Sequence, residues 1–375
     1  MKRKNYDNPF LNLVIAAFAI LILLSLIGCI FHTQPDVELA DGTSVTVVEK
    51  SYSNDPSKLS IGIVNKINLV SSSGTESIGK NKQRILELID VAKKYDVNMV
   101  LFPEFSLTGY FWENTPTCWD YMRVGLTNNH LDWLAEVKSK IDDQLQYIVF
   151  NNIRLDPDDS DGKFLNSTYV IDKTFDCTNL NSESNEQLHI YDKTFLPGIE
   201  KTFTKSGKTD TLILNTQWGK FGFTTCYDMC FTQIFQEYAM IDKIDGFIQV
   251  SSWRGSSKRE YSRMGVTVDH YYGFVWDLMV SSQAAFNQAW VIASNAVGVQ
   301  NRGGYEFWGG SGLWAPSGVK LFEGSNDYEE IIVVHNVGIK EQSKYEHDDF
   351  FYYEDFIEVY DPITKLRTFT RMEGR

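Results

Sequence analysis

The chain has 375 residues, of which 43% are hydrophobic, and this is enough for one large domain with a sizeable core. Its formal net charge of −14 and its pI near 4.9 exclude the basic surface that a nucleic-acid-binding domain needs. The five cysteines are widely spaced and include no C-x-x-C pair, so neither a zinc site nor a disulfide framework is expected. A disulfide between Cys118 and Cys177 is an alternative that applies if the domain lies outside the cytoplasm. No motif calls for a cofactor or a metal.

The N-terminus combines a basic end with an uncharged apolar run. Three basic residues precede residues 10–31, which are about long enough to span a bilayer. The run includes Leu-Ile-Gly-Cys ending at Cys29, which resembles the lipobox of bacterial lipoproteins. Residues 1–31 are therefore expected to form a hydrophobic helix that acts as a lipoprotein signal or as an uncleaved signal-anchor, with a buried helix of the main domain as a third option. The first two options anchor the protein to a membrane and place its main domain outside the cytoplasm.

Beyond this run, the sequence predicts a tether followed by one domain. Residues 32–58 are polar and rich in Ser and Asp, which is typical of a linker. From residue 59 onward, strand-like apolar runs alternate with stretches that have apolar residues at helical spacing, such as Ser77–Tyr95. This alternation predicts an α/β domain over residues 59–340, with helices packed on sheets. Residues 341–375 are acidic and aromatic and form a C-terminal extension for which no structure is predicted.

Two polar stretches within the domain predict loops. Asn179–Gln187 reads as a polar loop. The basic stretch Ser251–Gly265 reads as a surface loop, with a role at the mouth of a pocket as the alternative. A sequon begins at Asn166, where an unmodified strand start is the expected state.

Three reactive residues lie where strand-like runs stop. Glu104 follows the run from Asn98, Lys193 ends a short run, and Cys226 follows the β-rich run Thr211–Thr225. In layered α/β folds, ligands gather outside the C-terminal ends of strands. A strand, a sharp turn and a helix can present a nucleophile beside free backbone N–H groups, whose positive field can hold a thiol as thiolate. Taken singly, each residue is better explained as a solvated side chain or a buried structural cysteine, but together they predict one site.

The segments around these residues carry a family resemblance. FPEFSLTGY, YDKTFLPGIE and FGFTTCYDMCF resemble the three signature segments of the nitrilase superfamily, the carbon–nitrogen hydrolases, in the family's order. The likeness extends over roughly residues 59–337. It implies a four-layer α-β-β-α sandwich, which in this family is usually paired through its helices into dimers, so a homodimer is expected here as well.

The resemblance also implies roles for the site residues. Glu104 corresponds to the general base, Lys193 to the lysine that stabilises the oxyanion, and Cys226 to the nucleophile. The backbone N–H of Tyr227 is the expected second oxyanion donor. Glu200 is the candidate for a second glutamate that helps to position groups in the site. The expected reaction is hydrolysis of a non-peptide amide bond in a small linear substrate through an acyl-enzyme on the cysteine.

Two further features concern the lining of the pocket and the branch of the family. Trp253 ends a strand near Cys226 and either lines the pocket or belongs to the core. NTQWGKFGFTTCYDMCF and GGSGLWAPSG look most like the vanin and biotinidase branch, whereas Cys230 stands where many soluble members have arginine.

Three further functions stay as alternatives. One is an N-acyltransferase, which passes the acyl group to an amine and which the chain resembles in LPGIE and CYD. Another is a membrane-tethered binding protein with a vestigial site. A Cys/His protease is disfavoured, because none of the six histidines stands in a catalytic setting.

Overall fold

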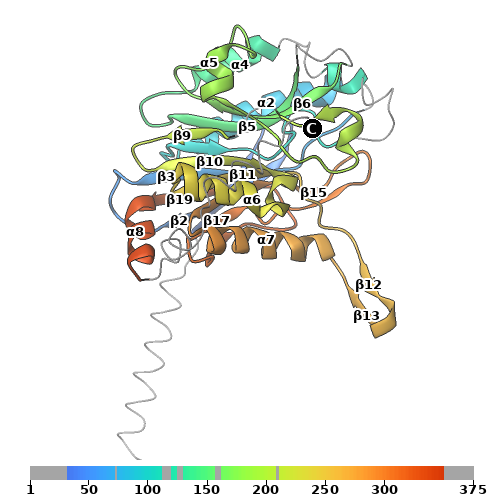
Figure 1. Ribbon diagram of the computed structural model, residues 1–375. Coiled ribbons are helices and arrows are strands. Elements are labelled where there is room, and N and C mark those ends of the chain that lie inside the picture. Colours follow the sequence, from blue (N-terminus) through green and yellow to red (C-terminus); the bar gives the residue numbers. More distant parts are fainter. Residues whose placement is uncertain are drawn as a thin grey trace, which may run out of the picture.

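Two β-sheets face each other and helices cover their outer faces, as the computed structural model in Figure 1 shows. The structure describes residues 32–71, 74–111, 120–124, 130–156, 162–207 and 211–349. This architecture confirms the expected α/β sandwich of the nitrilase type. The predicted N-terminal hydrophobic helix lies outside these residues. Within them, no helix combines the length and the apolar character needed to cross a membrane.

The large sheet contains nine strands among the described residues. In spatial order they are β1 (His32–Glu38), β2 (Ser44–Ser51), β19 (Glu330–Val337), β3 (Leu59–Asn65), β4 (Met99–Leu101), β5 (Tyr147–Leu155), β6 (Phe164–Ile171) and β7 (Ile190–Asp192), with β8 (Thr204–Lys205) paired to β6. Strands β3, β4 and β5 are parallel, and the helices that connect them lie on the outer face of the sheet.

The small sheet contains six strands among the described residues, and Cys226 follows one of them. Its spatial order is β18 (Lys320–Glu323), β17 (Gly312–Trp314), β14 (Trp290–Asn295), β11 (Gly246–Ser251), β10 (Lys220–Thr225) and β9 (Ile213–Asn215). Strands β10, β11 and β14 are parallel, so their C-terminal ends meet at one edge. Two small antiparallel pairs lie outside this sheet: β12 (Arg259–Tyr261) with β13 (Val266–Val268), and β15 (Val297–Val299) with β16 (Glu306–Trp308).

Helices cover both sheets, and short helical turns shape the loops at the strand ends. The α-helices are α2 (Thr75–Lys93), α4 (His130–Ser139), α5 (Glu183–Leu188), α6 (Thr232–Gln236), α7 (Tyr271–Asn287) and α8 (Ile339–Asp349). The π-helix η3 (Glu237–Asp242) continues α6, and the 3₁₀ turns are η1 (Glu200–Thr202), η2 (Cys226–Cys230) and η4 (Ser262–Met264). Helices α2 and α4 cover the large sheet, and α6 and α7 cover the small sheet (Figure 1).

The core lies mainly between and behind the sheets. One hydrophobic cluster joins the two sheets and includes Ile61 and Ile63 of β3 and Phe223 of β10. A second cluster joins the large sheet to its outer helices through Leu88 of α2 and Leu134 of α4. Burial of these side chains is the main force that holds the layers together.

The segment predicted as a tether is folded into the large sheet. Residues 32–58 include β1 and β2, and β2 runs parallel to β19 with Val47 opposite Ile331. Val45 and Val47 are buried and alternate with polar residues, which is a strand pattern that the polar composition of the segment conceals. The prediction of a linker over residues 32–58 is therefore wrong, and the domain begins upstream of residue 59.

The C-terminal boundary also differs from the prediction. Helix α8 begins at Ile339 and continues through the first residues of the predicted extension. The indole N–H of Trp290 donates to the Ile339 carbonyl and the Ser343 hydroxyl, both at 3.1 Å. Residues 341–349 are thus part of the domain, and residues 350–375 lie outside the described residues.

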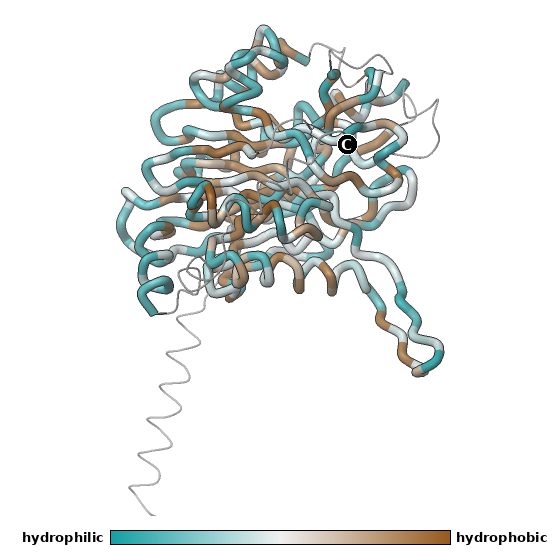
Figure 2. The backbone as a smooth tube through the Cα atoms, viewed as in Figure 1, coloured by the Kyte–Doolittle hydropathy of each residue, from teal (hydrophilic) through white to brown (hydrophobic). Residues whose placement is uncertain are grey.

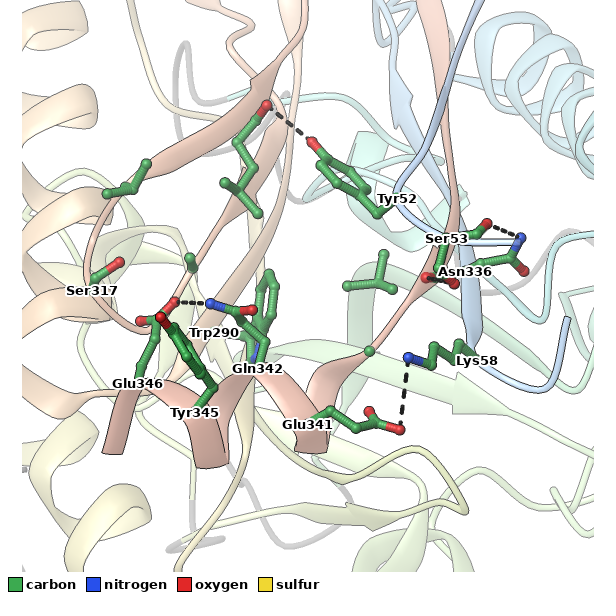
Figure 3. A pocket seen from close by; sticks show the side chains of 15 residues that line it. Tyr52, Ser53, Lys58, Trp290, Ser317, Asn336, Glu341, Gln342, Tyr345 and Glu346 are labelled. Carbon is green, nitrogen blue, oxygen red and sulfur yellow. Dashed lines mark hydrogen bonds and ion pairs between the residues drawn. The ribbon is translucent and has the colours of Figure 1, made fainter. Parts of the chain in front are cut away.

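A groove of about 640 Å³ opens beside α8 (Figure 3). It is lined by side chains from both sheets and from α8, including Tyr52, Trp290 and Tyr345. Trp290 is the first residue of β14, so this groove lies at the edge where the parallel strands of the small sheet begin. Glu104, Lys193, Glu200 and Cys226 are not among its lining residues.

Candidate active site

Cys226 is held in a sharp turn between a strand and a helix. It follows the last residue of β10 and begins η2, with a φ angle of 49° in the left-handed region that few non-glycine residues adopt. A reciprocal capping box fixes this turn: the Thr225 N–H donates to Asp228 Oδ2 at 2.9 Å, and the Thr225 side chain accepts from the Asp228 N–H. The predicted strand, turn and helix are therefore present, with the cysteine at the junction.

Asp228 also connects the turn at Cys226 to the segment around Lys193. Its Oδ2 accepts a hydrogen bond from the Tyr191 hydroxyl at 2.7 Å, and its Oδ1 accepts one from the Phe195 N–H at 2.7 Å. These donors lie on either side of Lys193. Burial raises the pKa of Asp228 to about 6, although Lys193 and the hydrogen-bond donors oppose this rise. One buried carboxyl group thus links two segments that are more than thirty residues apart in the sequence.

Glu104, Lys193 and Glu200 form one cluster, here called the buried charge cluster. Lys193 Nζ lies 2.9 Å from Glu104 Oε1, and 2.9 and 3.1 Å from the two carboxylate oxygens of Glu200. All three side chains are fully buried. The three come from separate segments: a loop after β4, a loop after β7, and η1. Buried ions need partners of opposite charge, and this arrangement supplies them.

Polar groups around the buried charge cluster orient its carboxylates. The Asn166 side-chain amide donates to Glu104 Oε1 at 2.8 Å and to Glu200 Oε2 at 3.3 Å. The backbone N–H of Ser252 donates to Glu104 Oε2 at 2.9 Å, and the Tyr110 hydroxyl donates to Glu200 Oε1 at 3.3 Å. Each carboxylate is therefore held by protein donors in addition to Lys193, which fixes the direction in which its oxygens point.

Burial and mutual attraction shift the protonation of this cluster. Burial disfavours the ammonium of Lys193, but the charges of Glu104 and Glu200 outweigh it and raise the pKa of Lys193 well above its usual value. Burial raises the pKa of Glu200 to about 7 in spite of Lys193. The cluster therefore keeps a permanent cation and contains one carboxyl group that exchanges its proton near neutral pH.

The thiol of Cys226 belongs to the same electrostatic environment. Its pKa is raised well above the usual value, first by burial and then by the charge of Glu104, while Lys193 acts in the opposite direction. The sequence-based expectation of a thiolate held by a helix N-terminus is therefore not met. The reason is physical: η2 has only five residues and a weak dipole, whereas burial and a nearby carboxylate both favour the neutral thiol.

Tyr227 and Trp253, the two remaining predicted site residues, take different positions. Tyr227 is the second residue of η2, where a backbone N–H has no acceptor within the helix, as an oxyanion donor requires. The Trp253 indole is buried, and its N–H donates to the Tyr272 carbonyl of α7 at 2.7 Å. Trp253 thus packs in the core beside the site, while its neighbour Ser252 contacts Glu104 directly.

The sequence alone did not single out Asn166, Tyr110 or the Ser252 N–H. Asn166 was visible as a polar residue in an apolar strand, and this was the available signal. The side-chain Oδ1 of Asn166 accepts a hydrogen bond from the Asn151 amide at 2.8 Å. Asn151 also contacts Thr168, whose hydroxyl lies 2.9 Å from that of Thr225. This buried polar chain connects β5 and β6 of the large sheet to the end of β10. Among the described residues, no group of His, Cys, Asp or Glu could hold a metal ion.

The carbon-nitrogen hydrolase family model matches residues 67–337 of this chain. A probable nitrilase of Schizosaccharomyces pombe is 23% identical over 166 residues, covering 44% of this chain and 54% of the relative. The chain thus matches about half the length of that relative.

Solved structures share the fold. A carbon-nitrogen hydrolase from Helicobacter pylori has a TM-score of 0.62 at 17% identity, over 81% of this chain and 97% of its own. A Saccharomyces cerevisiae member of branch 10 of the nitrilase superfamily has a TM-score of 0.56 at 19% identity, over 78% of this chain and 94% of its own.

The site and the fold define a cysteine-containing α/β sandwich with a buried Glu–Lys–Glu cluster. The family match, which covers most of the sequence, shows that this chain belongs to the carbon–nitrogen hydrolase family.

Proposed function

We propose that this protein hydrolyses the amide bond of a small linear substrate through an acyl-enzyme on Cys226. The observation that carries the proposal is the buried charge cluster beside the thiol, in which Lys193 lies 2.9 Å from Glu104. This arrangement supplies a base, a fixed cation and a nucleophile within one environment, and acyl transfer needs all three. In a mutant of an amidase from Nesterenkonia, a structural neighbour with a TM-score of 0.55, acrylamide has added to the active-site cysteine.

Acylation begins from the neutral thiol. Glu104 accepts the proton from the Cys226 sulfur as the sulfur attacks the amide carbon, so the thiolate forms only when the electrophile is in place. Negative charge develops on the amide oxygen, where the Lys193 ammonium and the Tyr227 N–H stabilise it; one such donor is typically worth about 2.7–4 kcal/mol. Glu104 then returns the proton to the leaving nitrogen, the C–N bond breaks, and a thioester remains on Cys226.

Deacylation uses the same groups in reverse. Glu104 takes a proton from water, the resulting oxygen nucleophile attacks the thioester, and the proton passes to the sulfur as the acid leaves. The proposed role of Glu200 is to hold Lys193 in place through the contacts at 2.9 and 3.1 Å. If an amine replaces water in this half-reaction, the enzyme acts as an N-acyltransferase, and the product then distinguishes the two functions.

Three further parts of the proposal rest on sequence or surface features. Likeness of the cysteine segment and of residues 309–318 to the vanin and biotinidase branch favours secondary amides as substrates. The apolar run before residue 32 supports anchoring at a membrane with the domain outside the cytoplasm; a full-length chain that fractionates as a soluble protein would contradict it.

Helix α7 supports the proposed homodimer. Phe274, Leu278 and Phe286 lie on its outer side and are 56%, 51% and 65% exposed. Hydrophobic colour follows this helix in Figure 2. Pairing of two copies through α7 would bury these side chains. A strictly monomeric protein at micromolar concentration in sedimentation experiments would contradict this pairing.

Cysteine substitutions test the proposed function. We expect Cys226→Ser to lose at least about 1,000-fold in the rate of amide hydrolysis, because a hydroxyl is a far weaker nucleophile than a thiol without a histidine base. Release of the amine from a panel of primary and secondary amides is the measurement, and Cys230→Ser, four residues away on the same turn, is the matched control. Full activity in Cys226→Ala, which has no nucleophile at this position, would rule out the covalent route.

A further inference from the structure

An exposed arginine follows closely in sequence after a residue that contacts the buried charge cluster. Ser252, Trp253 and Arg254 follow β11, and the Ser252 N–H donates to Glu104 at 2.9 Å while the Arg254 side chain is exposed. Two residues of extended chain span at most about 7 Å, so the backbone of Arg254 lies within that distance of a group bonded to the proposed base. The chain thus passes from Ser252, which contacts Glu104, to the exposed Arg254 within two residues.

A second connection runs through aromatic side chains. The Arg254 guanidinium lies over the ring of Tyr305, 5.0 Å from its centroid. Tyr305 packs edge-to-face on Tyr110 with 5.6 Å between centroids, and the Tyr110 hydroxyl donates to Glu200. Both the backbone and the rings therefore connect the exposed Arg254 to residues that contact the two carboxylates of the buried charge cluster.

The position of Arg254 is fixed rather than left to a mobile loop. The Trp308 N–H donates to the Trp253 carbonyl at 2.9 Å, and the Gly255 N–H donates to the Glu306 carbonyl at 3.0 Å. These bonds pair the backbone on both sides of Arg254 with β16. Stacking on Tyr305 holds the guanidinium plane while leaving its N–H groups at the edge able to donate.

The charge of Arg254 is not neutralised within the protein. In the part of the chain that the structure describes, no carboxylate forms an ion pair with it, and its contact is with a ring. A guanidinium has a permanent charge and matches a carboxylate through two parallel hydrogen bonds. In a chain of net charge −14, an exposed cation that has no ion pair among the described residues and lies two residues from a group bonded to Glu104 is suited to bind an anionic group.

We propose that Arg254 binds a carboxylate of the substrate, so that this enzyme prefers amides that carry a negative charge a few bonds from the scissile bond. The inference rests on the proposed amide hydrolysis and adds its substrate class. The carboxylate belongs either to the acyl portion or to the amine portion of the substrate, and two pairs of amides separate these cases. Glutaramate with pentanamide tests the acyl portion, and N-acetyl-β-alanine with N-propylacetamide tests the amine portion.

The test compares kcat/KM within each pair for the full-length protein. We expect the anionic member to be preferred in one pair, and Arg254→Ala to lower that preference about 10- to 100-fold, the effect of losing a charge-assisted pair of hydrogen bonds. Arg254→Glu should reverse the preference. Arg259→Ala is the matched control, because this exposed arginine also stacks on a ring, at 4.4 Å from the centroid of Tyr271, but on the β12–β13 hairpin away from the cluster.

Two results overturn the inference in distinguishable ways. If the wild-type enzyme turns over neutral and anionic members equally, or Arg254→Ala leaves the preference unchanged, the carboxylate site is wrong and the proposed hydrolysis stands. If no amide of either pair is hydrolysed and Cys226 is never acylated, both the inference and the proposed function fail.

Discussion

Glu200 is fully buried, yet the structure gives its carboxyl group a proton that exchanges near neutral pH. Its pKa rises from the usual 4.5 to about 7 because burial outweighs the attraction of Lys193. Below about pH 4.5 the group is protonated in both the folded and the unfolded chain, and above about pH 7 it is ionised in both. Between these values the folded state binds more protons, so the free energy of unfolding falls as pH rises.

The difference between the pKa of Glu200 in the folded and in the unfolded chain predicts how Glu200→Gln changes the pH dependence of stability. Glu200→Gln removes the titrating group and keeps its shape, so we expect the fall in unfolding free energy between pH 4.5 and pH 7 to shrink by about 3 kcal/mol. Urea unfolding at several pH values measures this slope. The exposed Glu183→Gln on α5 should leave it unchanged. Equal slopes in the wild type and Glu200→Gln would mean that the pKa of Glu200 is not raised in the folded protein, contrary to the effect expected from its burial.

Strand β2 shows how an element can be concealed by its composition. The strand lies between β1 and β19; its Val45 and Val47 belong to the core that faces α2, and its Val48 belongs to the core between the sheets. Without it, the edge of β19 would present a row of unpaired backbone groups to solvent. The polar segment is thus required by the sheet rather than serving as a spacer.

Truncation tests this role of β2. We expect a chain that begins at Leu59 to aggregate or to lose most of its thermal stability, because the edge of β19 and the apolar residues under β2 become exposed. A chain that begins at His32 should keep the fold. Melting temperature and solubility of the two chains are the measurements. Equal stability of both would show that residues 32–58 are a tether after all.

The whole molecule brings the reactive side chains together because its two sheets face each other. Glu104 and Lys193 follow β4 and β7 of the large sheet, and Cys226 follows β10 of the small sheet. The order Glu104, Lys193, Cys226 and the alternation of helices and strands predicted the family, the sandwich and the meeting of these residues. The surrounding donors could not be predicted, since Asn166 reaches Glu104 through the strand order of the large sheet and the Ser252 N–H reaches it through the packing of the small sheet on the large one.

Local chemistry explains the other differences between sequence and structure. Asn179–Gln187 predicts a loop, yet Ser182 caps α5 by accepting from the Asn185 N–H, so a helix turn forms in a polar stretch. The basic stretch Ser251–Gly265 predicts a surface loop, yet it begins with buried residues at the end of β11 and continues into the exposed β12–β13 hairpin, which projects from the body in Figure 1. In both cases a cap or a turn outweighs average composition, and hydrophobic pattern alone does not detect it.

Acylation of Cys226 is the central claim, and the intact mass of the full-length protein during turnover of a slow amide measures it. We predict a mass increase equal to the acyl group, located on Cys226 after proteolysis, and its absence in Cys226→Ser and in Lys193→Met. Turnover of the amide with no adduct on Cys226 at any time, or with the adduct on Cys230, would contradict the mechanism.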